Sequence, residues 1–191
     1  VVELLEKFPI VAIAGPRQSG KTTLSKILKP NYKYVNLENL SNREFAKTDP
    51  MGFLQTYQNG VIIDEIQNVP SLFSYLQVVT DERSINGEYI ITGSQNFLMM
   101  EQIAQSLAGR VALFTLLPLS IQELKNTEYS PISWENYALS GSYARKLIQH
   151  IDASDYYENY IKTYVERDVR LLKNISNLDL FQKFIKLLAG R

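Results

Sequence analysis

Short apolar runs recur along the first two thirds of the chain, and polar or glycine-containing segments separate them. Several runs lack polar alternation, which is typical of strands buried on both faces of a parallel sheet. The predicted strands are residues 10–14, 32–37, 61–63, 89–91 and 111–116. Helical spacing fills the gaps between them, and this alternation predicts an α/β fold with a doubly wound parallel sheet and helices on both faces.

The pattern changes after Pro118, where helical spacing continues without further strands. The predicted helices are residues 21–28, 41–47, 51–58, a segment after Pro70, 97–107, 120–125, 133–140, 153–173 and 177–188. The N-terminus is expected to lead directly into the first strand. We therefore predict a core over residues 1–127 and a small helical lid or linker subdomain over residues 128–191. Because the last helix stays strongly apolar, we expect a further C-terminal region after Arg191.

The composition is that of a soluble globular protein, with 45% hydrophobic and 21% charged residues. The chain has no cysteine and one histidine, which excludes disulfides, thiolate metal sites and multi-histidine metal sites. It contains no apolar run of about 18 residues, so we expect no membrane span. These features favour a cytoplasmic protein.

The strongest motif follows the first predicted strand and opens the first predicted helix. It matches G-x-x-x-x-G-K-[ST], a loop whose backbone amides cradle phosphate groups. The helix that follows offers its positive N-terminal end to the same anion. We predict that this loop binds the phosphates of ATP, through Gly15, Pro16, Arg17, Gln18, Ser19, Gly20, Lys21, Thr22 and Thr23.

Two side chains of this loop have specific predicted roles. Lys21 is expected to reach the β- and γ-phosphates, and the hydroxyl of Thr22 to coordinate Mg²⁺.

Asp64 follows another buried strand and is expected to hold the same Mg²⁺, because ligands bind at the carboxyl ends of strands in open α/β sheets. Glu65 comes next and is expected to orient and activate the attacking water.

Two further positions are candidates with alternatives. Ser94, at the end of the next strand, is predicted to sense the γ-phosphate, with Thr92 and Gln95 as rivals and a helix-capping turn as the structural alternative. Arg110 lies just before the last strand. It is predicted to stabilise charge on the transferred phosphoryl group of a neighbouring subunit in a homo-oligomer, or else simply to pair with an acid.

Longer segments of the chain resemble a known family. GPRQSGKTTL, VNLENL, VIIDEIQNVPSLFSYLQ, YIITGSQNFLM, SLAGRVALFTLLPLSIQEL and YYENYIKTYVERDVRLL are similar to the prokaryotic AAA+-type ATPases called AAA_14, over nearly the whole chain. The resemblance implies an ASCE-type P-loop core with strand order 5-1-4-3-2 and a helical lid. It also implies a following domain named DUF4143, with winged-helix-like and nuclease-like character.

Together these features favour Mg²⁺-dependent ATP binding and hydrolysis by an AAA+-like ATPase. It would drive or gate a C-terminal effector that binds DNA or a protein, or resembles a nuclease. One alternative is a slow nucleotide-gated module that recruits partners differently in its ATP and ADP states. The other is a small-molecule kinase, which Glu65 beside Asp64 disfavours because a water-activating carboxylate invites hydrolysis.

Overall fold

The computed structural model describes residues 1–94, 103, 105–167 and 177–189. Contacts between Cα atoms divide the chain into two compact units, Val1–Pro118 and Leu119–Arg191. The domain boundary predicted between residues 127 and 128 stays a prediction. Within the described residues, no helix is both long and apolar enough to cross a membrane.

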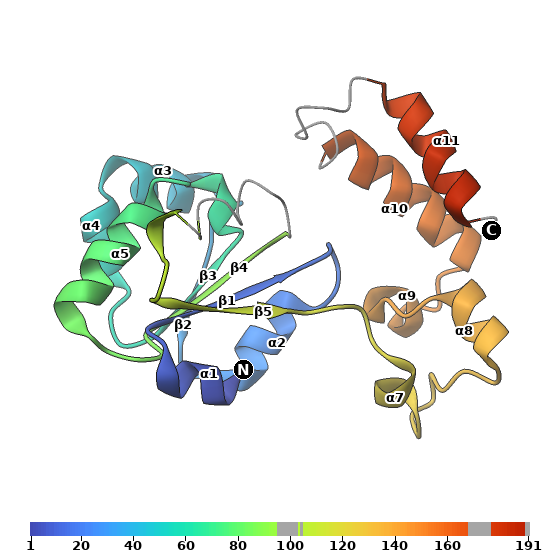
Figure 1. The fold of residues 1–191 in the computed structure, drawn as a ribbon, viewed down its shortest axis with the longest axis horizontal. Helices are drawn as coiled ribbons and strands as arrows, with labels where there is room; N and C mark the ends of the chain where they lie inside the picture. Colours follow the sequence, from blue (N-terminus) through green and yellow to red (C-terminus); the bar gives the residue numbers. More distant parts are fainter. Residues whose placement is uncertain (95–102, 104, 168–176, 190–191) are drawn as a thin grey trace. The chain divides into compact units, whose positions relative to one another are not determined.

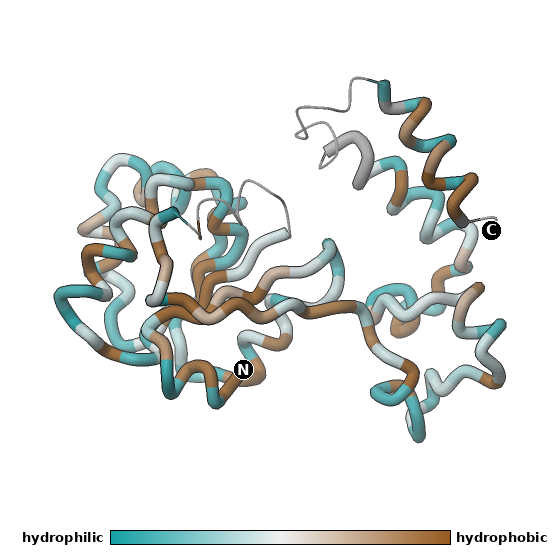
Figure 2. The backbone as a smooth tube through the Cα atoms, in the orientation of Figure 1, coloured by the Kyte–Doolittle hydropathy of each residue, from teal (hydrophilic) through white to brown (hydrophobic). Residues whose placement is uncertain are grey.

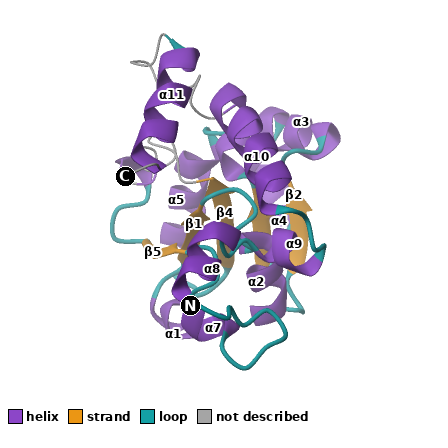
Figure 3. Ribbon diagram, turned by 90° about the vertical axis from the view of Figure 1, so that its right-hand side faces the viewer, coloured by secondary structure: helices purple, strands orange, loops and turns teal. Residues whose placement is uncertain are grey.

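The first unit is built on one five-stranded sheet (Figure 1). Every strand pairing is parallel, and the order is β2-β3-β4-β1-β5, which confirms the predicted order 5-1-4-3-2 read from the other edge. Figure 3 shows this sheet in orange among the helices. The strands are β1 (Ile10–Gly15), β2 (Lys33–Asn36), β3 (Val61–Asp64), β4 (Tyr89–Ser94) and β5 (Val111–Thr115).

The helices of the first unit largely follow the predicted pattern. They are α1 (Val2–Lys7), α2 (Lys21–Leu28), α3 (Leu40–Thr48), α4 (Pro50–Thr56), α5 (Leu72–Arg83) and the 3₁₀ turn η1 (Ile66–Asn68). The expectation that the N-terminus leads directly into β1 is wrong, because α1 precedes it. A helix of six residues has too few apolar positions to show a 3.6-residue period. The predicted helix 97–107 lies mostly outside the described residues.

Alternation along the strands sends apolar side chains to both faces of the sheet. Ile10, Ala12 and Ala14 face a core that α3, α4 and α5 complete. Val11 and Ile13 face the opposite core, which includes Leu5 of α1. Helix α2 lies on the same side as α1 (Figure 1), and Figure 2 shows the hydrophobic character of the central strands. The sheet is therefore covered on both faces, as the uninterrupted apolar runs predict.

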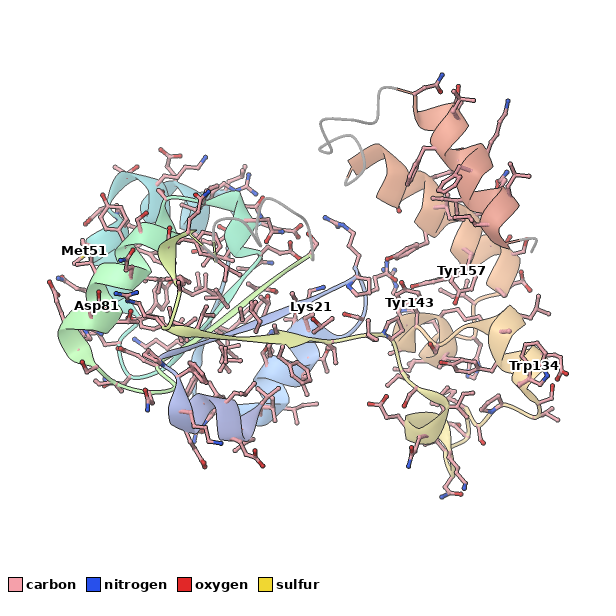
Figure 4. All side chains as sticks on the ribbon, in the orientation of Figure 1. Lys21, Met51, Asp81, Trp134, Tyr143 and Tyr157 are labelled. Carbon is pink, nitrogen blue, oxygen red and sulfur yellow. The ribbon has the colours of Figure 1, made fainter. Side chains whose placement is uncertain are left out.

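The described residues of the second unit form helices joined by loops, without a strand. Its helices are α7 (Ile121–Leu124), α8 (Trp134–Ser140), α9 (Ala144–Ile148), α10 (Ala153–Arg167) and α11 (Leu178–Ala189). The sequence pattern missed the five-residue α9, and residues 168–173 of the long predicted helix lie outside the described part. Tyrosine rings pack together here: the ring centroids of Tyr143 and Tyr160 are 5.1 Å apart, and those of Tyr156 and Tyr157 are also 5.1 Å apart. Figure 4 shows Tyr143 near Tyr157.

Candidate functional site

The loop between β1 and α2 closes around a lysine. The Nζ atom of Lys21 donates to the carbonyl oxygens of Gly15 at 3.0 Å and Pro16 at 2.8 Å, and the residue is only 6% exposed. Gln18 and Gly20 adopt positive φ values of 62° and 96°, which turn the backbone back on itself. The lysine cation therefore lies at the carboxyl end of β1, inside the curve of the loop (Figure 4).

Two polar features of the same loop suit an anion. The N-cap residue of α2 is Gly20, which has no side chain to cap the helix. The first backbone amides of α2 can therefore donate to an anion at the positive end of the helix. The hydroxyl of Ser19 is buried and has no hydrogen-bond partner among the described residues. Buried hydroxyls normally have a partner, and a phosphate oxygen would supply one.

Gly15 is required by the close approach of the chain that follows β5. A Cβ atom at this position would overlap the carbonyl oxygen of Leu116 and lie 3.1 Å from the Ser19 hydroxyl. The Leu116 carbonyl cannot move freely, because the amide of the same residue donates to the Ala14 carbonyl at 2.8 Å.

We therefore expect Gly15→Ala to lower the free energy of unfolding by about 1–3 kcal/mol, the usual cost of overpacking. Urea denaturation measures the change. Ser74→Ala, an exposed substitution on α5, is the control. Equal stability of Gly15→Ala and the unmodified protein would contradict the close approach.

Asp64 joins the loop to the neighbouring strands. The hydroxyls of Thr22 and Tyr34 both donate to its Oδ2 atom, at 2.9 Å and 2.7 Å. The hydroxyl of Thr92 bonds its Oδ1 atom. The residue is 5% exposed. Asp64 and Thr92 each lie two residues after Ile62 and Ile90 in the same strands, so their side chains point to the same face of the sheet. Ile62 and Ile90 pack on the face opposite α3, α4 and α5. Strand alternation thus aims both side chains toward the face where α2 lies.

Tyr34 is a site residue that the sequence pattern missed. It lies in the edge strand β2, and the Nζ atom of Lys26 in α2 is 3.5 Å from the centre of its ring. Burial, together with the bond to Asp64, raises the pKa of the Tyr34 hydroxyl, so it acts as a neutral donor. Its reach to Asp64 depends on β2 and β3 being neighbours, which residue spacing alone does not reveal.

Glu65 directly follows β3 in a left-handed backbone conformation with φ 57°. Such strain at a non-glycine residue persists only where the surrounding structure imposes it, and functional sites are a common place. Burial raises the pKa of Glu65 above its ordinary value; the bond from Gln67 and the charges of Lys21 and Arg17 oppose this shift. The amide of Gln67 bonds both Glu65 Oε2 and, at 3.4 Å, the Ser94 hydroxyl.

The structure thus brings most predicted site residues to one edge of the sheet, where the parallel strands end. Thr23 is exposed on α2, and Arg17 and Gln18 lie in the loop itself. Of the two rivals to Ser94 as the γ-phosphate sensor, Gln95 lies outside the described residues. The hydroxyl of the other rival, Thr92, bonds Asp64 Oδ1. The residues gathered at this edge are Lys21, Thr22, Asp64, Glu65 and Ser94.

Arg110 is not brought to this edge. It precedes β5, and its carbonyl accepts from the amide of Ile10 at the start of β1, so it lies at the amino ends of the strands. Its Nε and Nη2 atoms bond Asp81 at 2.5 Å and 2.8 Å, and this pairing lowers the pKa of Asp81. Figure 4 shows Asp81 far from Lys21. The observed contact is the acid-pairing alternative, and a role in a neighbouring subunit stays a prediction.

The donor set at the loop suits a magnesium–nucleotide complex. No three side chains of histidine, cysteine, aspartate or glutamate cluster as metal ligands within the described residues. Thr22 and Asp64 instead offer a hydroxyl and a carboxylate side by side. Mg²⁺ is commonly held by one or two protein oxygens, with phosphate oxygens and water completing its octahedron. The residues therefore fit this ion in the presence of a triphosphate.

Comparison with known proteins agrees with this geometry. Residues 7–125 match the family model AAA_14, described as an AAA domain. The chain belongs to the AAA_14 family. Its first unit is therefore an AAA-type P-loop ATPase domain. The C-terminal residues 132–191 match a different model, the domain of unknown function DUF8612. The DUF4143 domain that the resemblance implies after this segment stays a prediction.

Two relatives and a solved structure are also similar to this chain. The uncharacterized protein Rv2008c of Mycobacterium tuberculosis is 30% identical over 169 residues, which are 88% of this chain and 38% of the relative. The uncharacterized protein MJ1544 of Methanocaldococcus jannaschii is 25% identical over 80% of this chain and 34% of its own length. The Walker-type ATPase PABY2304 of Pyrococcus abyssi aligns with a TM-score of 0.55 and 16% identity, over 90% of this chain and 72% of that one. The chain spans well under half the length of these curated relatives.

Proposed function

We propose that the first unit of this AAA_14 protein binds and hydrolyses ATP in a Mg²⁺-dependent reaction. One observation carries the proposal: the Thr22 hydroxyl donates to Asp64 Oδ2 at 2.9 Å. This bond joins the phosphate-binding loop to the strand that bears the acidic pair. It brings together the hydroxyl and the carboxylate that would hold the ion.

Each residue of the loop has a distinct part in binding. Lys21 would bond β- and γ-phosphate oxygens in place of the Gly15 and Pro16 carbonyls, because a hydrogen bond from a cation to a charged acceptor is stronger than one to a neutral carbonyl. The amides of the loop and of the start of α2 would contact the same oxygens. Thr22 and Asp64 would hold Mg²⁺, which neutralises charge on the β- and γ-phosphates when bound.

The chemical step needs a water molecule and a base. Glu65 is proposed to accept a proton from water as the water oxygen bonds to the γ-phosphorus. The bond from that phosphorus to the β–γ bridging oxygen breaks, and the products are ADP and phosphate. Ser94 is proposed to contact the γ-phosphate, since it lies at the end of β4 within 3.4 Å of the Gln67 amide that also holds Glu65.

We extend the proposal to the rest of the protein. The matched region is 38% of the length of the mycobacterial relative, so most of that relative's sequence lies outside the region that resembles this chain. ATP hydrolysis would drive or gate such an attached region, whether it binds DNA or a protein partner. A longer form of the chain, compared with this one for ATP-dependent binding of partners, would test the extension.

Release of phosphate from ATP by the purified protein tests the central proposal. Phosphate is expected to accumulate with MgCl₂ and to stop with excess EDTA. ADP formation that matches phosphate release would separate hydrolysis from transfer to another acceptor. The absence of phosphate release by well-folded protein that binds ATP would overturn hydrolysis but leave a nucleotide-gated switch.

Tyr34→Phe is expected to raise the Mg²⁺ concentration that the reaction requires. The substitution removes one of two donors to Asp64 Oδ2 while the ring stays under Lys26. Loss of a hydrogen bond that orients a metal ligand typically costs about tenfold or more in metal affinity. We therefore expect a higher Mg²⁺ concentration for half-maximal turnover. Tyr75→Phe, on the exposed side of α5, is the control. If the Mg²⁺ concentration for half-maximal turnover is unchanged, the Tyr34 hydroxyl does not orient Asp64 and the residue contributes only packing.

A further inference from the structure

Gln67 lies between two site residues that come from different strands. It belongs to the turn η1, directly after β3 and Glu65. Its Nε2 group bonds the Oε2 atom of Glu65 and also lies 3.4 Å from the hydroxyl oxygen of Ser94, at the end of β4. One side-chain amide therefore spans the candidate base and the candidate γ-phosphate sensor.

The backbone fixes where this amide lies. Ile66 and Val69, on either side of Gln67, are completely buried. The turn is closed by bonds from the amide of Asn68 to the Glu65 carbonyl at 3.1 Å and from the amide of Val69 to the Ile66 carbonyl at 2.9 Å. Gln67 thus stands on a turn that buried neighbours hold in place, so its side chain has a defined origin beside Glu65.

The direction of the amide is set by charge. With Nε2 toward the Glu65 carboxylate, both amide hydrogens have acceptors; in the opposite orientation a carbonyl oxygen would face a carboxylate. The Oε1 atom of Gln67 is buried and has no hydrogen-bond partner among the described residues. An orphaned buried oxygen is unfavourable, so packing and stability alone do not account for a glutamine here.

We propose that Gln67 is a positioning residue that couples Glu65 to Ser94. It holds one carboxylate oxygen of Glu65 and leaves the other for the attacking water. Because the same nitrogen also bonds Ser94, a γ-phosphate that engages Ser94 changes the restraint on Glu65. This rests on the proposed hydrolysis and adds a residue through which the bound nucleotide controls the base.

The first test is a comparison of kcat with KM. Gln67→Leu keeps the volume and removes the donor, and kcat is expected to fall about tenfold or more, as misplacement of a reacting group does, with KM changed less than about twofold. Affinity for a non-hydrolysable ATP analogue, measured by fluorescence, is expected to stay unchanged. Because the two residues act together, Ser94→Ala added to Gln67→Leu should lower kcat by less than the product of the separate effects. Gln55→Leu, on the exposed face of α4, is the matched control.

The second test needs no turnover. In nucleotide-free protein labelled with ¹⁵N, the side-chain amide signals of Gln67 are identified by their loss in Gln67→Leu. They are expected to shift in both Glu65→Gln and Ser94→Ala, while those of Gln55 stay in place. A residue that only fills space would show neither shift.

The outcomes separate this inference from the proposed function. If the unmodified protein releases no phosphate from ATP, hydrolysis fails and the positioning role fails with it. If it does, but Gln67→Leu has the same kcat, only the role of Gln67 is overturned. Additive effects of Gln67→Leu and Ser94→Ala, or amide signals that respond to Glu65→Gln alone, would overturn the coupling to Ser94.

Discussion

Lys21→Ala is expected to abolish turnover and to weaken ATP binding by about a hundredfold or more, the loss that follows from removing charge-assisted hydrogen bonds to two phosphates. The position of Lys21 in the structure supports this expectation. Lys21 is 6% exposed and its Nζ atom already lies within the curve of the loop, held by the Gly15 and Pro16 carbonyls. Equilibrium binding of a fluorescent ATP analogue and phosphate release measure the two effects.

The control for this prediction is Lys47→Ala, which removes an exposed lysine from α3. It should bind and hydrolyse ATP as the unmodified protein does. Because Lys21→Ala also leaves two carbonyl oxygens without their donor, the fold of the variant is checked by thermal unfolding. Unchanged nucleotide affinity and turnover in a folded Lys21→Ala protein would contradict the assignment of the loop.

The fold could be predicted largely because its strands are buried on both faces. Uninterrupted apolar runs such as residues 61–63 of β3 have one common environment, the centre of a parallel sheet. The elements that escaped prediction are short. Helix α9, Ala144–Ile148, spans little more than one turn, and η1 spans three residues. Neither is long enough to show a periodic pattern, so tertiary packing rather than local pattern decides them.

The candidate site also has a part that the sequence predicts and a part that it does not. The phosphate-binding loop is local, so a spacing motif predicts it. The roles of Tyr34 and Gln67 depend on which strands are neighbours. Tyr34 reaches Asp64 from β2, and Gln67 reaches Ser94 from the turn η1 after β3. The location of Arg110 follows from strand direction: a residue before a parallel strand lies at the edge opposite the one where the loop after β1 begins. That Asp81 is the acid with which Arg110 pairs could be seen only in the structure.

Glu65→Gln is expected to lower turnover by about a hundredfold or more, the usual contribution of a general base. ATP binding should be retained, because Lys21, Thr22 and Asp64 are untouched and the new amide oxygen still accepts from Gln67. The reaction of the unmodified protein should fail on the acid side at a pH above the ordinary Glu value of about 4.3, since the pKa of Glu65 is raised by burial and the base must be ionised. Phosphate release across a pH series measures both effects.

The same shift predicts an effect on stability. A folded-state pKa above the unfolded value means that the folded protein holds the Glu65 proton more tightly. Stability from this group is present below the unfolded pKa and is lost as the pH rises through the folded one. A neutral glutamine has no such loss, so Glu65→Gln should be more stable than the unmodified protein at pH 8 and equal to it in acid.

Glu82→Gln, an exposed substitution on α5, is the matched control and should change neither turnover nor the pH profile of unfolding. The two readouts of Glu65→Gln answer different questions. Normal turnover would remove Glu65 from the reaction, whatever its environment. Lost turnover without a gain in stability at pH 8 would keep the base but contradict its burial. Only loss of turnover together with a gain that disappears in acid supports a strained, partly buried carboxylate kept for its chemistry at a cost in stability.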